Sequence, residues 1–184
     1  MHTFKFRSLF IALAVTLPMA ASVPAFAASK ADLESSSKAA LNQLVAQNPG
    51  AKALNAKAVA VLVFPKVTKA GLGVGGQFGE GVLWRKGKAA GYYNTAGASY
   101  GLQAGAQQYG YAMFFMNQKA LDSLNSTQGF EVGVGPSVVV MDEGKAKNVP
   151  SGTLTEDIYA FIFSQKGLMA GLGIQGNKIT QIVK

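Results

Sequence analysis

The chain has 184 residues, enough for one domain with a hydrophobic core, and its 17 basic and 9 acidic residues give a net charge of +8 at pH 7. It contains no cysteine, which excludes disulfides, thiolate nucleophiles and cysteine-based zinc sites. Its single histidine, His2, lies in an N-terminal segment that we expect to be removed. We therefore predict no enzymatic activity, no catalytic residues, no metal site and no cofactor.

Residues 1–27 have the three parts of a secretory signal peptide. Lys5 and Arg7 precede the apolar stretch Leu9–Leu17, and Ala25-Phe26-Ala27 is a small-x-small cleavage signal. We expect cleavage after Ala27, an exported periplasmic protein that is free or peripheral to a membrane, and one domain over residues 28–184. Removal of the two basic residues leaves a net charge of +6, and this excess lies in residues 28–90, where nine basic residues stand against three acidic ones.

Two helices are predicted at the start of this domain. Ser29 with Asp32 three residues later forms a capping box, and apolar residues at helical spacing follow it. Asn48-Pro49-Gly50 ends this helix, and Ala51–Ala58 predicts a second, short helix.

An apolar strand over Val59–Phe64, which we expect Pro65 to close, leads to the glycine-alternating run Ala70–Gly79. Glycines at every second position of a strand lie on one face and indicate that something approaches the backbone closely. The pattern returns at Ala170–Gly176, which suggests two strands with the same packing role.

The rest of the chain predicts mainly strands. Residues 82–85 and 90–93 form a hairpin around Lys86-Gly87-Lys88. Further strands are expected over 98–105, 109–116, 130–135, 137–141, 158–163, 168–174 and 178–183, with a helix over 117–124 and a loop over 145–154. The predicted fold class is α+β, with N-terminal helices packed on a twisted, mainly antiparallel, glycine-rich β-sheet that forms a closed or partly closed barrel.

The spacing Gly71-x-Gly73-x-x-Gly76 matches the dinucleotide-binding fingerprint only in letters. That motif needs a strand that runs directly into a turn and a helix, with an acid about 20 residues later. Here five residues separate strand from glycines, and strand pattern follows them. We therefore interpret the run as structural.

The basic residues near this run are the candidate binding residues. A cluster of surface lysines and arginines attracts anionic lipid by about 1 kcal/mol per residue, and export makes nucleic acid the weaker choice of partner. Trp84, Tyr92 and Tyr93 are expected in the core, with a surface that meets lipid headgroups as the alternative. The candidate lipid-binding residues are Lys52, Lys57, Lys66, Lys69, Arg85, Lys86 and Lys88.

Five segments in order resemble the SYLF lipid-binding domain, and the resemblance spans residues 31–183. They are Val61–Lys66, Gly71–Gly81, Gly101–Gln107, Phe130–Val134 and Phe163–Gly171. The resemblance implies a non-enzymatic protein that binds anionic phospholipid, as eukaryotic members bind phosphoinositides, and in some members actin. A bacterial-type signal peptide places this chain where neither of those two ligands is expected, so we carry over only lipid or membrane-surface binding.

Two other hypotheses stay open at this point. One is a structural or interaction protein of the cell envelope without a lipid ligand, in which the glycine faces are filled internally. The other is a small outer-membrane β-barrel, since the expected mature length suits eight strands.

Overall fold

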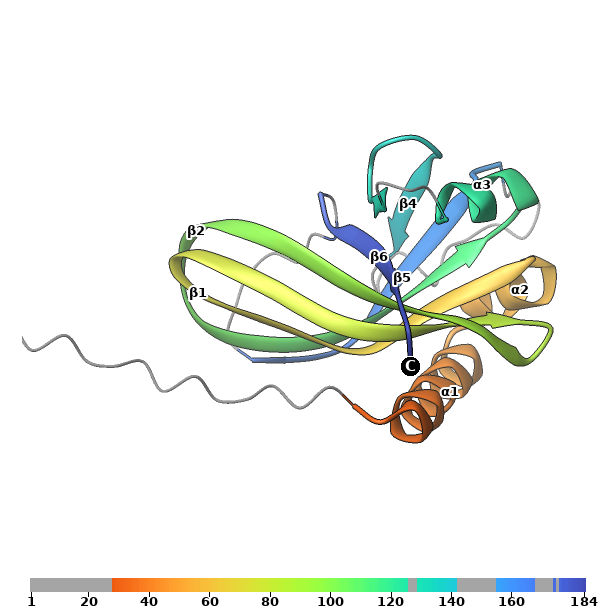
Figure 1. Cartoon of the computed structure of the whole chain (residues 1–184), viewed down its shortest axis with the longest axis horizontal. Coiled ribbons are helices and arrows are strands. Elements are labelled where there is room, and N and C mark those ends of the chain that lie inside the picture. The colour runs from red at the N-terminus through yellow and green to blue at the C-terminus, as the bar shows by residue number, and fades with distance from the viewer. Residues whose placement is uncertain (1–27, 126–128, 142–154, 168–173, 175) are drawn as a thin grey trace, which may run out of the picture.

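The computed structural model describes residues 28–125, 129–141, 155–167, 174 and 176–184 (Figure 1). Helices and strands follow one another in the order α1 (Lys30–Gln47), α2 (Pro49–Lys57), β1 (Ala60–Arg85), β2 (Lys88–Phe115), α3 (Gln118–Ser123), β3 (Phe130–Glu131), β4 (Val138–Met141), β5 (Ile158–Gly167) and β6 (Lys178–Ile182). The predicted strand over 168–174, the glycine echo at 170–176 and the loop over 145–154 fall wholly or mostly outside the described residues and stay predictions.

Local capping chemistry sets the helix ends as predicted. The Ser29 hydroxyl accepts from the Asp32 backbone N–H at 3.1 Å, which begins α1. Asn48 ends α1 and also caps α2, because its side-chain oxygen accepts from the Ala51 N–H at 3.0 Å. Pro49 then occupies the first turn of α2, where a missing N–H costs nothing, so this helix begins earlier than Ala51.

Strands β1 and β2 form one long antiparallel ribbon. Their register runs from Ala60 opposite Phe115 to Arg85 opposite Lys88. Lys86 and Gly87 both have positive φ, +48° and +77°, which is the tight hairpin turn whose twist matches that of the strands. The prediction that Pro65 closes a strand is wrong, because a bulge between Phe64 and Val67 lets β1 continue through the proline.

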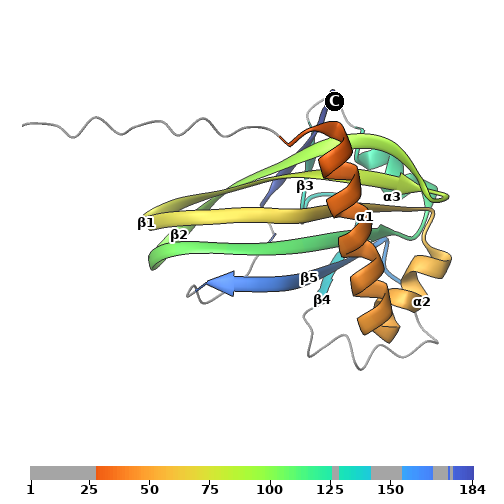
Figure 2. The same ribbon diagram turned by 90° about the horizontal axis from the view of Figure 1, so that it is seen from below.

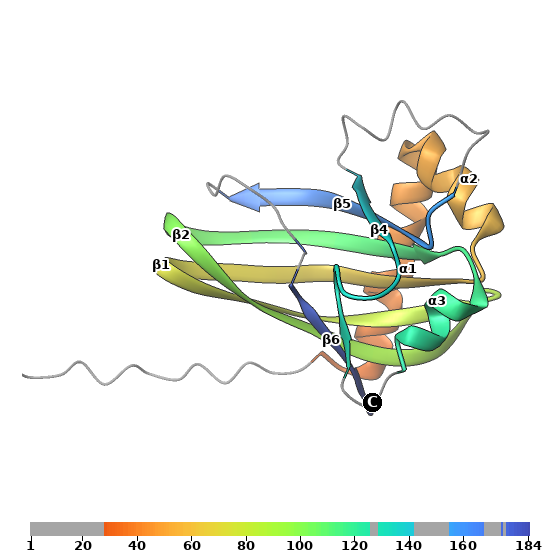
Figure 3. The ribbon, with the colours of Figure 1, turned by 90° about the horizontal axis from the view of Figure 1, so that it is seen from above.

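The ribbon bends back on itself at its glycine-rich middle. Figures 1 and 3 show β1 and β2 running away from the helices, turning and returning. The register shifts between Leu72 and Val74, at that bend. A Cβ atom on Gly71 would clash with the Cα of Gly75, so the close approach predicted from the glycine run is made by the strand itself.

The other glycines of the run let the two halves of β1 meet. A Cβ on Gly79 would lie 2.7 Å from the Lys66 carbonyl oxygen and 2.7 Å from Val67 Cγ2, and a Cβ on Gly81 would lie 2.6 Å from the Val63 carbonyl oxygen. Real Cβ atoms do not come this close to backbone atoms, so the glycines are required by packing.

The ribbon is part of a six-stranded mixed sheet. Five of its strands follow the order β3-β6-β2-β5-β4, and β1 also pairs with β2. The first half of β2 pairs with β6 and the second half with β5, both antiparallel, while β4 adds to β5 in parallel. The sheet curls into a partly closed barrel, which confirms the predicted α+β fold class (Figure 1).

Side chains on the two faces of the sheet belong to two separate hydrophobic cores. One fills the barrel interior and includes Phe64, Tyr111 and Met113. The other lies under the helices and includes Val63, Phe114 and Phe161 with helical leucines. Figure 2 shows α1 lying across the ribbon, and Figure 3 shows α3, β4 and β6 on the opposite side. Each fully buried large side chain contributes about 1.5–3 kcal/mol, so both faces of the sheet stabilise the fold.

Candidate functional site

The structure separates the predicted basic residues into groups. Arg85, Lys86 and Lys88 are exposed at the β1–β2 hairpin, and Lys52 and Lys57 are exposed on α2. Lys66 is exposed on β1, on another part of the surface.

Lys69 does not lie at the surface that the lipid hypothesis requires. It is only 6% exposed, pairs in register with buried Gln107 and shares the interior side of β1 with Val67. The bulge before Val67 sets this orientation, because it shifts which positions of the strand point inward.

Two predicted residues, Arg85 and Lys86, line a cleft together with a third cation, Lys38. The cleft has a volume of about 370 Å³ and lies between α1, α2 and the hairpin. Its other lining residues are Leu41, Asn42, Val45, Asn55, Ala58, Val59, Ala60, Val61, Trp84 and Gly87. None of these lining residues is acidic, so we name it the basic cleft.

Trp84 forms the floor of the basic cleft and holds Lys38 in place. Its indole Nε1–H donates to Ser37 Oγ at 2.8 Å, and the Lys38 Nζ lies 4.7 Å from the centre of the ring. A cation over an indole face gains about 0.5–1 kcal/mol at an exposed site. Trp84 and Tyr93 are 9% and 1% exposed, which confirms their expected core position and rules out a lipid-facing aromatic surface made of these two rings.

The opening of the cleft is fixed from the hairpin side. Arg85 Nη2 donates to Gln118 Oε1 at 3.0 Å, which ties the hairpin to α3. No sequence signal places Lys38 here, since it is far from Arg85 along the chain and joins it only because α1 lies across β1.

Two nearby carboxylates are engaged elsewhere. Glu34 accepts a hydrogen bond from the Tyr92 hydroxyl, and this bond raises the pKa of Tyr92. Glu80 forms a salt bridge with Lys184 at 2.9 Å. Neither of these acids lines the basic cleft, which therefore presents a local excess of positive charge that suits an anionic group.

A buried polar network lies inside the barrel. The Tyr109 hydroxyl donates to Gln77 Oε1 at 2.5 Å, Gln77 Nε2 donates to Asn177 Oδ1, and the Tyr111 hydroxyl donates to Thr95 Oγ1 at 2.7 Å. Burial raises the pKa of Tyr109 to about 12 and raises the pKa of Tyr111 as well. Both phenols therefore stay protonated at neutral pH, which suits a structural network of hydrogen bonds and not an acid–base site.

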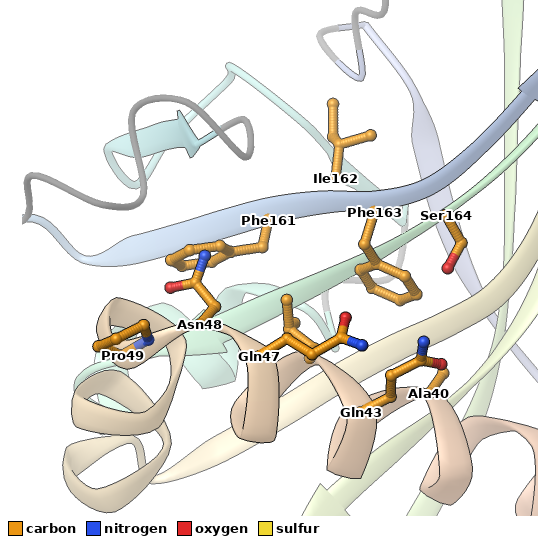
Figure 4. Close-up of a pocket in the computed structure, with 10 residues that line it drawn as sticks. Ala40, Gln43, Gln47, Asn48, Pro49, Phe161, Ile162, Phe163 and Ser164 are labelled. Atoms are coloured by element: carbon orange, nitrogen blue, oxygen red, sulfur yellow. The ribbon is translucent and has the colours of Figure 1, made fainter.

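A second hollow runs along the other side of α1. Two cavities, of about 630 Å³ and 860 Å³, share the lining residues Ala40, Gln43, Phe163 and Ser164. Figure 4 shows the first of them, with Phe161 and Phe163 directed toward α1 and Ile162 directed away. This hollow, the α1 groove, was not predicted as a site, because its lining comes from four separate stretches of sequence.

Other kinds of site are limited by what the described part of the chain contains. Among its residues, no group of three or more His, Cys, Asp and Glu side chains could hold a metal ion. In the same residues, none of the helices has the length and apolar character needed to cross a membrane.

Comparison with known proteins identifies the C-terminal half. Residues 96–183 match the family model Ysc84, described as a Las17-binding protein actin regulator. A search of curated proteins found no relative of the chain. The matched region begins within β2 and includes α3 and β3 to β6, so it covers much of the barrel. The match over residues 96–183 agrees with the SYLF resemblance that the sequence motifs indicated.

Proposed function

We propose that this protein is a non-enzymatic, exported protein of the bacterial periplasm that binds anionic phospholipid headgroups at the basic cleft. The observation that carries the proposal is the convergence of Lys38, Arg85 and Lys86 on one cleft without an acidic lining residue. The match of residues 96–183 to the Ysc84 family model supports a binding role in general.

The hairpin suits contact with a surface. Arg85, Lys86, Gly87 and Lys88 are all exposed, and the tight turn holds the flanking cations in a fixed arrangement. Each surface cation attracts anionic lipid by about 1 kcal/mol, so this cluster supports weak, salt-sensitive recruitment. The family description concerns Las17 and actin, and we do not extend either to a protein with an expected bacterial export signal.

The test is sedimentation of the mature protein with vesicles of phosphatidylglycerol or cardiolipin, and with phosphatidylcholine vesicles for comparison, at low salt. The variant Arg85→Gln/Lys86→Asn keeps the turn, because Asn tolerates positive φ. Loss of two cations at about 1 kcal/mol each predicts roughly 30-fold weaker binding to anionic vesicles.

The matched control is Lys166→Gln/Lys178→Gln, which removes the same charge from two exposed positions outside the cleft. Equal loss in both variants would show a net-charge effect and would refute the basic cleft as the site. No binding of the unmodified protein to either anionic vesicle would favour the envelope interaction protein. A requirement for detergent to release the protein from membranes would favour the outer-membrane barrel.

A further inference from the structure

The α1 groove comprises two cavities. They adjoin each other, because they share four lining residues, two on α1 and two on β5, and Figure 4 shows the lining of the first. Each cavity alone has the volume typical of a small-molecule site.

The groove exists because α1 carries small side chains where it faces β5. Ser36, Ala39 and Ala40 line it from the helix, and larger residues at these positions would fill the space. The sheet side contributes the apolar residues Pro65, Phe78 and Phe163, next to polar Lys66, Thr68, Glu80 and Ser164.

Apolar surface continues from the groove to the outside. Phe78 is 51% exposed and lines the groove, and Val74, on the same side of β1 four residues earlier, is 65% exposed. Exposed large apolar side chains that lie together are typical of binding sites, whereas single scattered ones are not.

One cation at this groove is available to a ligand. Lys66 and Glu80 both belong to the lining, but Glu80 already pairs with Lys184 at 2.9 Å. Since Glu80 is the only acid among the described lining residues, Lys66 is the positive charge that this lining does not neutralise. Its side chain is exposed and can reach an anionic group at the groove opening.

We propose that the α1 groove binds one long-chain fatty acid, with the hydrocarbon chain along Ala40 and Phe163 and the carboxylate at Lys66. A single unbalanced cation matches the single charge of a carboxylate, and the apolar side chains of Ala40, Phe78 and Phe163 along the groove can contact an unbranched hydrocarbon chain. The basic cleft lies on the other side of α1 and has no lining residue in common with the groove, so this proposal is independent of headgroup binding.

The experiment measures displacement of a fluorescent fatty acid from the delipidated mature protein by oleate, below the concentration at which oleate forms micelles. The expected result is saturable binding of one oleate per chain. Ala40→Phe places a large ring in both cavities and should weaken oleate binding at least tenfold. The control, Ala46→Phe, makes the same change at an exposed position of α1 outside the groove and should leave binding unchanged.

A second variant avoids dependence on the packing of α1. Lys66→Gln should weaken oleate binding roughly fivefold or more, because it removes a pairwise attraction of about 1 kcal/mol or more, and should leave oleyl alcohol binding unchanged. Absence of saturable oleate binding, equal affinity of the Ala40→Phe and Ala46→Phe variants, or binding of lysophospholipid without fatty acid would each overturn the proposal. Arg85→Gln/Lys86→Asn should still bind oleate, which separates this site from the basic cleft.

Discussion

Substitution of Gly79 by alanine tests whether the two halves of β1 need a glycine between them. The new methyl group would lie 2.7 Å from the Lys66 carbonyl oxygen and 3.1 Å from the Val67 Cα, whereas ordinary contact begins near 3.4 Å. Two of the atoms in the way belong to the backbone, so the strand itself has to move. Overpacking of this kind costs about 1–3 kcal/mol, and the lower entropy of the unfolded alanine chain offsets about 0.5 kcal/mol. The expected net loss of unfolding free energy is about 1.5 kcal/mol.

Gly76→Ala is the matched control in the same strand. Its methyl group would meet only the Gly97 carbonyl oxygen, at 3.8 Å, and neither glycine has a positive φ. We therefore expect this variant to be as stable as the unmodified protein or about 0.5 kcal/mol more stable.

The assay is urea unfolding followed by the fluorescence of Trp84, the only tryptophan of the chain, which is 9% exposed when folded. A loss of about 1.5 kcal/mol corresponds to a melting temperature lower by about 3–6 °C for a domain of this size. If Gly79→Ala unfolds at the same urea concentration as Gly76→Ala, the close packing of the two halves of β1 is wrong.

Three further predictions concern other parts of the fold. Asn117 and Ser137 donate to the Asp157 carboxylate and lower its pKa from the ordinary value of 3.8, so its contribution to stability is present above about pH 4 and is lost as the pH falls through the folded pKa. Asp157→Asn should flatten this part of the pH dependence of urea unfolding, and an unchanged slope would contradict the assignment. Trp84→Phe should cost about 1 kcal/mol in thermal melts followed by circular dichroism, because Ser37 loses its donor, and part of this cost should disappear in a Ser37→Ala background. A fragment of residues 96–183 should show no cooperative melt, because it lacks β1, which pairs along most of β2, while residues 28–184 should melt cooperatively. A cooperative melt of the fragment would refute the single-domain prediction.

Features set by neighbouring residues were predictable from the sequence. The caps at Ser29 and Asn117 and the turn at Lys86-Gly87 depend on contacts within a few residues, and the structure contains all of them. The hydrophobic periodicity also sufficed for the fold class, because it marks which segments must be buried.

The strand orientation after Pro65 could not be predicted, because it depends on a bulge. Leu62 and Phe64 point into the barrel, so simple alternation would place Val67 and Lys69 outside. The bulge between Phe64 and Val67 reverses this order and buries Lys69. Pro65 is compatible with this arrangement because, within the described residues, β1 is hydrogen-bonded to β2 alone, so a residue without an N–H can face the edge of β1 that has no strand partner there.

Two of the three cations that line the basic cleft, Arg85 and Lys86, were among the predicted binding residues, and the third, Lys38, was not. Arg85 and Lys86 stand next to each other in the sequence, and their common location follows from the hairpin. Lys38 joins them only through the packing of α1 across the ribbon, and no local pattern encodes the direction in which a helix crosses a sheet.

The ribbon of β1 and β2 also has a consequence for the order in which the chain acquires its structure. The paired residues closest in sequence are Arg85 and Lys88, at the turn. With distance from the turn, the sequence separation of paired residues grows, up to Ala60 with Phe115. Since loop closure costs more entropy as the loop grows, we expect pairing to spread outward from the turn. Changes near Gly87 should therefore alter the folding rate, and changes near Ala60 and Phe115 should alter mainly the unfolding rate. The hairpin that carries Arg85 and Lys86 would then also limit the rate at which the barrel forms.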